Sequence, residues 1–246
     1  MILAAGKGTR MQSSRAKVLH PLAGRPMLGY VLDTAGLLAP DRLLVVVGHQ
    51  ADKVKKAFPG SGIEYVLQAP QLGTGHAIAV TRQALEKFAG DVLILCGDMP
   101  LIRAATLRRL IGLHFEKKAA CTFLSLQTSK PCDFGRVVRN PQGGVVRIVE
   151  DRDANPQEKT IDEYNSGVYC FDKFFLFNAL ENIGQDNSQN EYYLTDTISC
   201  LVRDGHRVEA MATTDDAEIL GINRLEDLAR AEDLLSFRGE SPPGPA

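Results

Sequence analysis

The first 115 residues alternate short apolar runs with helical patterns, and this alternation constrains the fold more than any other feature of the sequence. The strand-like runs are RLLVVVG (42–48), IEYVLQ (63–68) and DVLILCGD (91–98), and the helical patterns lie at 26–39, 51–58 and 74–88. The runs are rich in leucine and β-branched residues, as strands buried on both faces are. Their alternation with helices predicts an α/β fold with a doubly wound, mixed but mainly parallel sheet.

The pattern changes after residue 115. Strands are predicted at 119–127, 166–172 and 206–213, a hairpin at 135–151 with its turn at 141–144, and helices at 192–205 and 223–238. This mixture predicts an α+β extension of the same sheet rather than an independent domain. We therefore expect a single domain over residues 1–238, followed by a flexible tail, rich in proline and glycine, over 239–246.

The composition argues against several classes of function. A formal net charge of −2 on 246 residues gives no general attraction to nucleic acid or to an anionic membrane. No apolar run approaches the roughly 20 residues that span a bilayer, and the N-terminus does not resemble a signal peptide. The five cysteines are not spaced like a metal or redox motif, which indicates free thiols in a reducing cytoplasm. MILA (1–4) is short for a central strand, so we expect that strand to start further upstream.

The loop after the first strand, AAGKGTR (4–10), is a candidate anion site. Ligands of open α/β sheets bind beyond the carboxyl ends of the strands, and this loop follows such an end. Gly6 and Gly8 would let the backbone approach phosphate and point N–H groups at it. The cations that could add charge are Lys7, Arg10 and Lys17. A plain turn with surface charges is the alternative, and Met11 in place of the third glycine argues against a dinucleotide site.

Two further motifs carry polar side chains near strand ends. In LQAPQLGTGHA (67–77), Gln68 and Gln71 each have a donor and an acceptor, a combination that can read the Watson–Crick edge of uracil. Two exposed loop glutamines are the alternative. In LCGDMPLI (95–102), Asp98 follows a buried strand directly, where its carboxylate could hold a hard divalent cation or cap the next helix.

The stretch LAAGKGTRMQSSRAKVLHPLAGRPM (3–27) resembles the signature of the sugar-phosphate nucleotidyltransferases, in which G-x-G-T-R-M is followed by a lysine. KVLHPLAGRPM is typical of one branch, the N-terminal uridylyltransferase (pyrophosphorylase) domain of bifunctional bacterial enzymes that make UDP-N-acetylglucosamine. QLGTGHA (71–77) matches that branch without a gap, and the resemblance covers residues 2–237. One departure is Ala16, where the family usually has proline. It bears on the rigidity of the loop and not on the charge of Lys17.

The resemblance implies a Rossmann-like nucleotide-diphospho-sugar transferase fold, with a nucleotide-binding half (1–115) and a sugar-binding half (116–238). It implies that UTP and its uridine contact Leu3, Ala4, Ala5, Gly6, Gly8, Gln68, Gln71, Gly73 and Thr74. It implies that the sugar phosphate contacts Thr74, Gly135, Glu150 and Asn165, and that Mg²⁺ binds Asp98 and Asn223. The catalytic residues that it implies are Arg10, Lys17 and Asp98. A helix N-cap is the simpler alternative for Asn223. Thr74 is expected to cap the helix at 74–88.

The predicted reaction transfers UMP from UTP to N-acetyl-α-D-glucosamine 1-phosphate, giving UDP-N-acetylglucosamine and pyrophosphate. The predicted partners are therefore these small molecules, and neither a nucleic acid nor a membrane is expected. The predicted location is the cytoplasm. We expect no left-handed β-helix acetyltransferase domain, and therefore a monomer or a weak homo-oligomer. Two alternatives stay open. One is a nucleotidyltransferase of the same fold with another sugar 1-phosphate or nucleoside triphosphate, and the other is a non-catalytic protein that binds nucleotide sugars.

Overall fold

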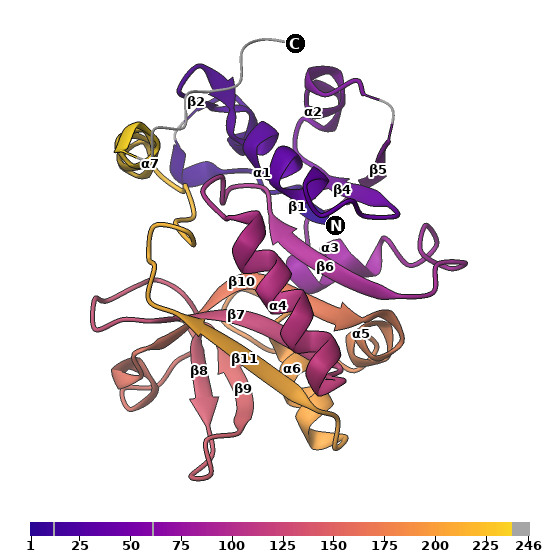
Figure 1. Ribbon diagram of the computed structural model, residues 1–246, viewed down its shortest axis with the longest axis vertical. Coiled ribbons are helices and arrows are strands. Elements are labelled where there is room, and N and C mark those ends of the chain that lie inside the picture. The colour runs from indigo at the N-terminus through magenta and orange to yellow at the C-terminus, as the bar shows by residue number, and fades with distance from the viewer. Residues whose placement is uncertain (12, 61, 238–246) are drawn as a thin grey trace.

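The computed structural model describes residues 1–11, 13–60 and 62–237, and within these ranges nine strands form one sheet (Figure 1). Seven of them lie in the order β11-β7-β10-β6-β1-β4-β5. The first half of the chain supplies four strands that pair parallel to one another, which are β6 (Asp91–Cys96), β1 (Ile2–Ala4), β4 (Leu43–Val47) and β5 (Ile63–Leu67). β1 is short, as expected, but it pairs on both sides, so the opening loop emerges from the middle of the sheet's carboxyl edge.

The strand β10 (Glu163–Asp172) joins the two halves, because it pairs antiparallel with β6 and with β7 (Cys121–Gln127). β11 (Val208–Thr213) completes the sheet beside β7, and its pairing is parallel. The hairpin of β8 (Arg136–Arg139) and β9 (Val145–Val149) pairs with β10 and projects at the bottom of Figure 1. The register of β10 against β7 shifts after Asn165, and such irregularities re-aim nearby side chains.

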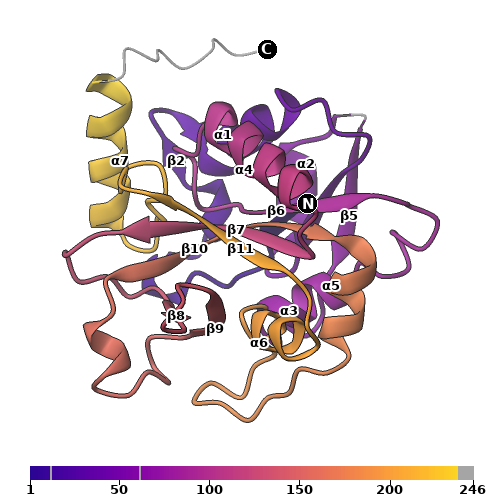
Figure 2. The ribbon, with the colours of Figure 1, turned by 60° about the horizontal axis from the view of Figure 1, so that its bottom comes forward.

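Helices cover both faces of the sheet (Figure 2). One face carries α1 (Met27–Gly36), α2 (Ala51–Ala57) and α4 (Ala104–Lys117), and the other carries α3 (Thr74–Ala79), α5 (Lys173–Leu180) and α6 (Asp196–Arg203). Adjacent strand residues therefore enter different cores: Leu95 packs with Leu28 and Leu107, whereas Ile94 packs with Ile78 and Leu176. Burial on both faces explains why these strands are apolar throughout.

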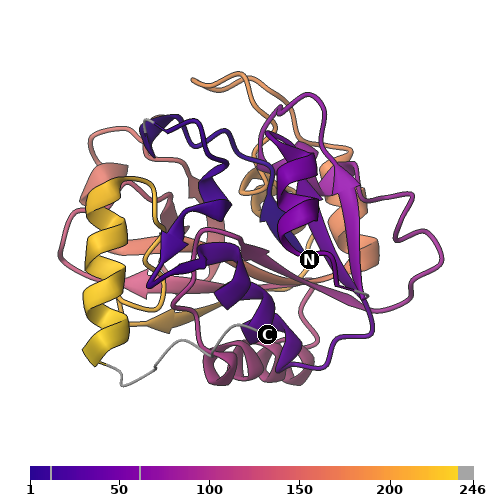
Figure 3. The same ribbon diagram turned by 90° about the horizontal axis from the view of Figure 1, so that it is seen from above.

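The last helix, α7 (Leu225–Phe237), lies apart from the sheet and packs on the N-terminal segment (Figure 3). Met11, Met27, Ile222 and Leu235 share a small apolar cluster there with Leu22, which belongs to the short ribbon of β2 (Pro21–Leu22) and β3 (Arg25–Pro26). This packing brings residues 222–223 back to the opening loop. Among the described helices, none is long and apolar enough to span a bilayer.

The predicted fold class is confirmed, and the predicted strands and hairpin are present with ends shifted by a few residues. Two helices, α4 and α5, were not predicted. The helix expected at 74–88 ends at Ala79 and continues as turns, where the Thr81 hydroxyl donates to Ile78 O at 2.7 Å and so competes with helical hydrogen bonding. The tail expected at 239–246 lies outside the described residues.

Truncation of Phe171 should show that the two halves share one core. Phe171 on β10 is fully buried, so Phe171→Ala should lower the free energy of unfolding by about 3–5 kcal/mol in urea denaturation. Phe174 is the matched control, since it is 64% exposed, and Phe174→Ala should change that free energy by less than about 0.5 kcal/mol. Equal effects of the two substitutions would contradict the shared core.

Candidate functional site

The opening loop runs from the end of β1 through two short 3-10 helices, η1 (Thr9–Met11) and η2 (Lys17–Leu19). Gly8 has a φ of +61°, and a Cβ there would lie 2.6 Å from Lys17 Cβ, so only glycine lets Lys17 come this close. At Gly6, a Cβ would meet no protein atom within 4 Å. The backbone at Gly6 therefore faces open space, as a loop that receives a ligand would.

Three segments far apart in the sequence meet at Lys17. Its Nζ donates to an oxygen of Asp98, at the end of β6, and to Asn223 Oδ1 at 2.6 Å, while Arg10 donates to the same Asn223 oxygen at 2.7 Å. The Lys17 and Asp98 side chains are 13% and 23% exposed, so the ion pair is partly shielded from water. The amide N–H of Ile222 donates to Asp98 O at 2.9 Å and fixes Asn223 beside Asp98.

This cluster fits a divalent cation by the chemistry of its oxygens. A carboxylate oxygen of Asp98 and an amide oxygen of Asn223 converge on the Lys17 ammonium. Such oxygens are the ligands that hard cations prefer. The described residues contain no group of three or more His, Cys, Asp or Glu side chains that could hold a metal by itself. Mg²⁺ commonly binds one or two protein oxygens together with substrate phosphates, and two protein oxygens suit that mode.

The simpler alternatives for Asp98 and Asn223 do not describe what their side chains do. Asp98 pairs with Lys17. The helix α7 begins at Leu225, and its start is capped by Asp227, whose Oδ2 accepts from the N–H groups of Asn223 and Arg224 at 2.8 Å each. The Asn223 side chain is thus left to face Lys17 and Arg10.

Ala16, where the resembled family usually has proline, keeps a proline-like backbone with φ −54° and ψ 134°. Its N–H, which proline would lack, donates to Gln50 Oε1 at 3.2 Å, and Gln50 Nε2 donates in turn to Ser14 O. Gln50 therefore holds residues 14–16 from the start of α2. The loop before Lys17 is therefore fixed by these two hydrogen bonds and not by the ring of a proline.

The predicted base-binding residues form a second group beside the opening loop. Gln68 is only 3% exposed and its Nε2 donates to Gly73 O at 2.9 Å, while Gln71 Nε2 donates to Gln68 O at 2.9 Å. Gly73 has a φ of +106°, and a Cβ there would lie 2.5 Å from Tyr192 O. Gly73, not Thr74, is the N-cap of α3, so the expectation that Thr74 caps this helix is wrong: its hydroxyl oxygen accepts from Leu194 N at 3.0 Å instead.

The end of β1 is continuous with this second group. Leu3 O accepts from Gly97 N at 2.9 Å, and Ala5 O accepts from His49 N at 3.1 Å. Ala4, the residue between them, is buried. A Cβ at Gly48 would lie 2.8 Å from Ala5 O and 2.6 Å from Gln71 Nε2. Gln71 and Ala5 therefore both lie against Gly48.

The predicted sugar-binding residues form a third group, on the second half of the sheet. Asn165 N donates to Gly135 O at 2.7 Å, and a Cβ at Gly135 would lie 3.5 Å from Glu150 Oε2. Glu150 Oε1 accepts from the Thr195 hydroxyl at 2.8 Å. Burial raises the pKa of Glu150, opposed in part by that hydrogen bond, because a charged carboxylate is costly to desolvate.

Residues 192–195 connect the second and third groups. Tyr192 O accepts from Gly75 N at 2.7 Å, Leu194 N donates to Thr74, and Thr195 holds Glu150. Tyr193 is 5% exposed, and its hydroxyl lies 3.3 Å from Asp153 Oδ2. Sequence reasoning did not find Gln50, Thr195 or Asp227, since each acts through a hydrogen bond to a residue on another segment or to the backbone.

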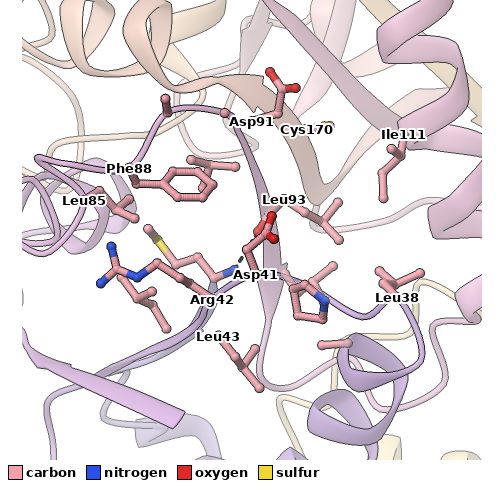
Figure 4. Close-up of a pocket in the computed structure, with 18 of the residues that line it drawn as sticks. Leu38, Asp41, Arg42, Leu43, Leu85, Phe88, Asp91, Leu93, Ile111 and Cys170 are labelled. Carbon is pink, nitrogen blue, oxygen red and sulfur yellow. Dashed lines mark hydrogen bonds between the residues drawn. The ribbon is translucent and has the colours of Figure 1, made fainter. Parts of the chain in front are cut away.

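The cavity of about 340 Å³ in Figure 4 is separate from these three groups of residues. Its lining includes Leu43 and Asp91, the first residues of β4 and β6, together with Leu38, Leu93 and Ile111. It therefore lies at the amino ends of these strands, opposite the edge where Asp98 follows β6. None of the predicted site residues lines it.

Known proteins resemble this chain in sequence. A family model described as the MobA-like NTP transferase domain matches residues 1–143. The bifunctional protein GlmU of Pelobacter propionicus is 48% identical over 239 residues, which are 97% of this chain and 52% of that protein. The protein of the same name from Geobacter metallireducens is 47% identical over 232 residues, 94% of this chain and 49% of that protein. The chain spans about half the length of the curated relatives it matches.

Two solved structures share the fold. A UDP-glucose pyrophosphorylase in complex with UDP-glucose superposes with a TM-score of 0.79 at 15% identity, covering 96% of this chain and 97% of the other. A putative glucose-1-phosphate thymidylyltransferase from Bacillus anthracis gives a TM-score of 0.76 at 18% identity, covering 95% and 93%. At these identities, the likeness establishes the fold.

Substitutions at Gln50 and Ala16 should depend on each other. Gln50→Ala removes two hydrogen bonds to the loop and should lower the free energy of unfolding by about 1–2 kcal/mol. In that background, Ala16→Pro has no N–H bond left to lose and should regain about 0.4–1 kcal/mol by restricting the unfolded chain. In the wild type, the same substitution also removes the bond to Gln50 and should give no gain. A double-mutant cycle by urea denaturation measures the difference, and additive effects would contradict it.

Proposed function

Because the chain belongs to the family of MobA-like NTP transferase domains, we propose that it transfers UMP from UTP to N-acetylglucosamine 1-phosphate and releases pyrophosphate. The observation that carries this proposal is the junction of Arg10, Lys17, Asp98 and Asn223 beside the opening loop. The relatives named GlmU, at 48% and 47% identity, support the choice of this reaction within the family.

In the proposed reaction, a phosphate oxygen of the sugar 1-phosphate attacks the α-phosphorus of UTP. A P–O bond forms there, the bond from the α-phosphorus to the oxygen that bridges to the β-phosphate breaks, and pyrophosphate leaves with the electron pair. The attacking phosphate is already largely ionised at neutral pH because its second pKa is about 6. No general base is required, so the absence of a histidine from the described cluster is consistent with this chemistry.

The difficulty of this reaction is electrostatic, since two anions must meet. Backbone N–H groups near Gly6 and Gly8 bind the phosphates, Arg10 binds the departing pyrophosphate, and Lys17 stabilises the charge at the α-phosphate and on the incoming phosphate. Mg²⁺ bound by Asp98 and Asn223 would supply further positive charge to the phosphate oxygens. With those two oxygens given to Mg²⁺, the Lys17 ammonium would be free to bind phosphate.

Recognition of the two substrates divides between the halves of the chain. In this proposal, Leu3, Ala4, Ala5, Gln68, Gln71, Gly73 and Thr74 bind the uridine part of UTP. Gly135, Glu150 and Asn165, with Thr74, bind the sugar phosphate, where a carboxylate, an amide and a free backbone group suit hydroxyls and an acetamido group. Residues 1–115 and 116–238 are then the nucleotide and sugar halves of one domain that acts in the cytoplasm as a monomer or weak homo-oligomer.

Pyrophosphate release tests the proposed reaction. Wild-type protein with UTP, N-acetylglucosamine 1-phosphate and Mg²⁺ should release pyrophosphate, and EDTA should abolish the release. Glucose 1-phosphate, and then CTP, GTP and dTTP, separate the other nucleotidyltransferases of this fold from the proposed one. Binding of UDP-N-acetylglucosamine with no release under any of these conditions would instead identify a nucleotide-sugar-binding protein.

Removal of Lys17 should move two measurements in opposite directions. Lys17→Ala should reduce the rate of pyrophosphate release by about 10²–10³-fold, because one charge-stabilising contact is lost. The same variant should bind Mn²⁺ more tightly in the absence of nucleotide, since no ammonium competes for Asp98 and Asn223. Lys56→Ala, which removes an exposed cation of α2, is the control for charge. Turnover within a few-fold of the wild type would show that the assigned role of Lys17 is wrong.

A further inference from the structure

The amide of Gln68 has a fixed orientation. Its Nε2 lies 2.9 Å from Gly73 O and 3.1 Å from His76 Nδ1. A backbone carbonyl oxygen only accepts hydrogen bonds, so the amide atom that faces it must be the nitrogen. The second hydrogen of the same nitrogen then points to His76, whose Nδ1 accepts it when the ring is neutral and carries its hydrogen on Nε2.

Both donor hydrogens of Gln68 are therefore used inside the protein. Among the described residues, no group donates to the remaining amide atom, Oε1. The Gln68 side chain is almost fully buried, and its backbone is held by Val47 O, which accepts from Gln68 N at 2.8 Å, and by Gln71 Nε2. What this side chain can offer a ligand is an acceptor alone, and not the donor and acceptor pair that the sequence suggested.

An acceptor of this kind distinguishes pyrimidines at ring position 3. Uracil has an N–H there, which can donate to a carbonyl oxygen, whereas cytosine has a lone pair at N3, which repels one. Sites built to pair with a ligand N–H reject analogues that lack it, because a buried polar atom is then left without a partner. The discrimination requires that Gln68 keep its second hydrogen away from the base.

We infer that His76 is a positioning residue that commits Gln68 to reading a base N–H, and so selects uridine over cytidine nucleotides. The inference rests on the proposed nucleotide site, but it concerns a residue to which that proposal gives no role. His76 lies on α3, one turn after Gly73, so both partners of the Gln68 amide come from the start of a single helix. Without the acceptor on His76, only the hydrogen bond to Gly73 O holds the Nε2 end, so the whole amide rotates more easily and can present its nitrogen to the lone pair of cytosine.

The test compares His76→Leu, which removes the acceptor, with His76→Asn, which places a side-chain oxygen near the position of Nδ1. Isothermal titration calorimetry with UTP and with CTP gives the ratio of the two dissociation constants for each protein. His76→Leu should lower the preference for UTP by about fivefold to tenfold, which corresponds to one hydrogen bond of roughly 1 kcal/mol. His76→Asn should keep the preference within about threefold of the wild type. His76→Ala takes the place of His76→Leu if the latter does not fold.

The outcomes separate this inference from the proposed function. Wild-type protein that binds neither nucleotide overturns the proposed function. Wild-type protein that prefers UTP, with the same preference in His76→Leu, overturns the role of His76 and leaves the proposed function intact. An equal loss of affinity for UTP and CTP in His76→Leu indicates a structural role only, and also overturns the inference. A loss for UTP with a gain for CTP, restored by His76→Asn, is the result expected.

Discussion

The hydrogen bonds of the Lys17 ammonium to Asp98 and Asn223 are the interaction on which the arrangement of the site depends. A partly buried charge is costly without partners, so the chain must bring a carboxylate and an amide oxygen to the same place. β6 delivers Asp98 directly from the sheet. Asn223 arrives only because the apolar cluster around Ile222 and Leu235 packs α7 against the N-terminal segment. The apolar packing of α7 thus completes a charged site.

The fold was largely predictable because its strands are buried on both faces. Runs such as LLVVV in β4 contain no polar residue that could face solvent. Their alternation with helices leaves few possible topologies. α5 (KFFLFNAL) was missed because it is short and apolar on every side, so it has no helical periodicity to detect. The antiparallel insertion of β10 between β6 and β7 depends on contacts between strands that are distant in the sequence, and no local sequence pattern predicts it.

The candidate site was predictable to the extent that its residues follow strand ends. The carboxyl ends of parallel strands meet at one edge, so Gly6, Gln68 and Asp98 were expected to lie near one another. Gln50 and Thr195 were not predictable, because their roles consist of single hydrogen bonds to Ala16 and Glu150 across the fold. Gln50 also shows how the alanine at position 16 is accommodated: the N–H that proline would lack becomes an anchor.

In the proposed reaction, the same geometry makes the binding of metal and of nucleotide interdependent. A divalent cation held by two protein oxygens would have room for phosphate oxygens as further ligands. Those two oxygens are also the ones to which Lys17 and Arg10 donate, so the two side chains would have to release them to a bound cation. Nucleotide phosphates would attract the Lys17 and Arg10 side chains and so lower the cost of releasing the two oxygens. Since linkage is reciprocal, whatever the nucleotide adds to metal affinity, the metal adds to nucleotide affinity.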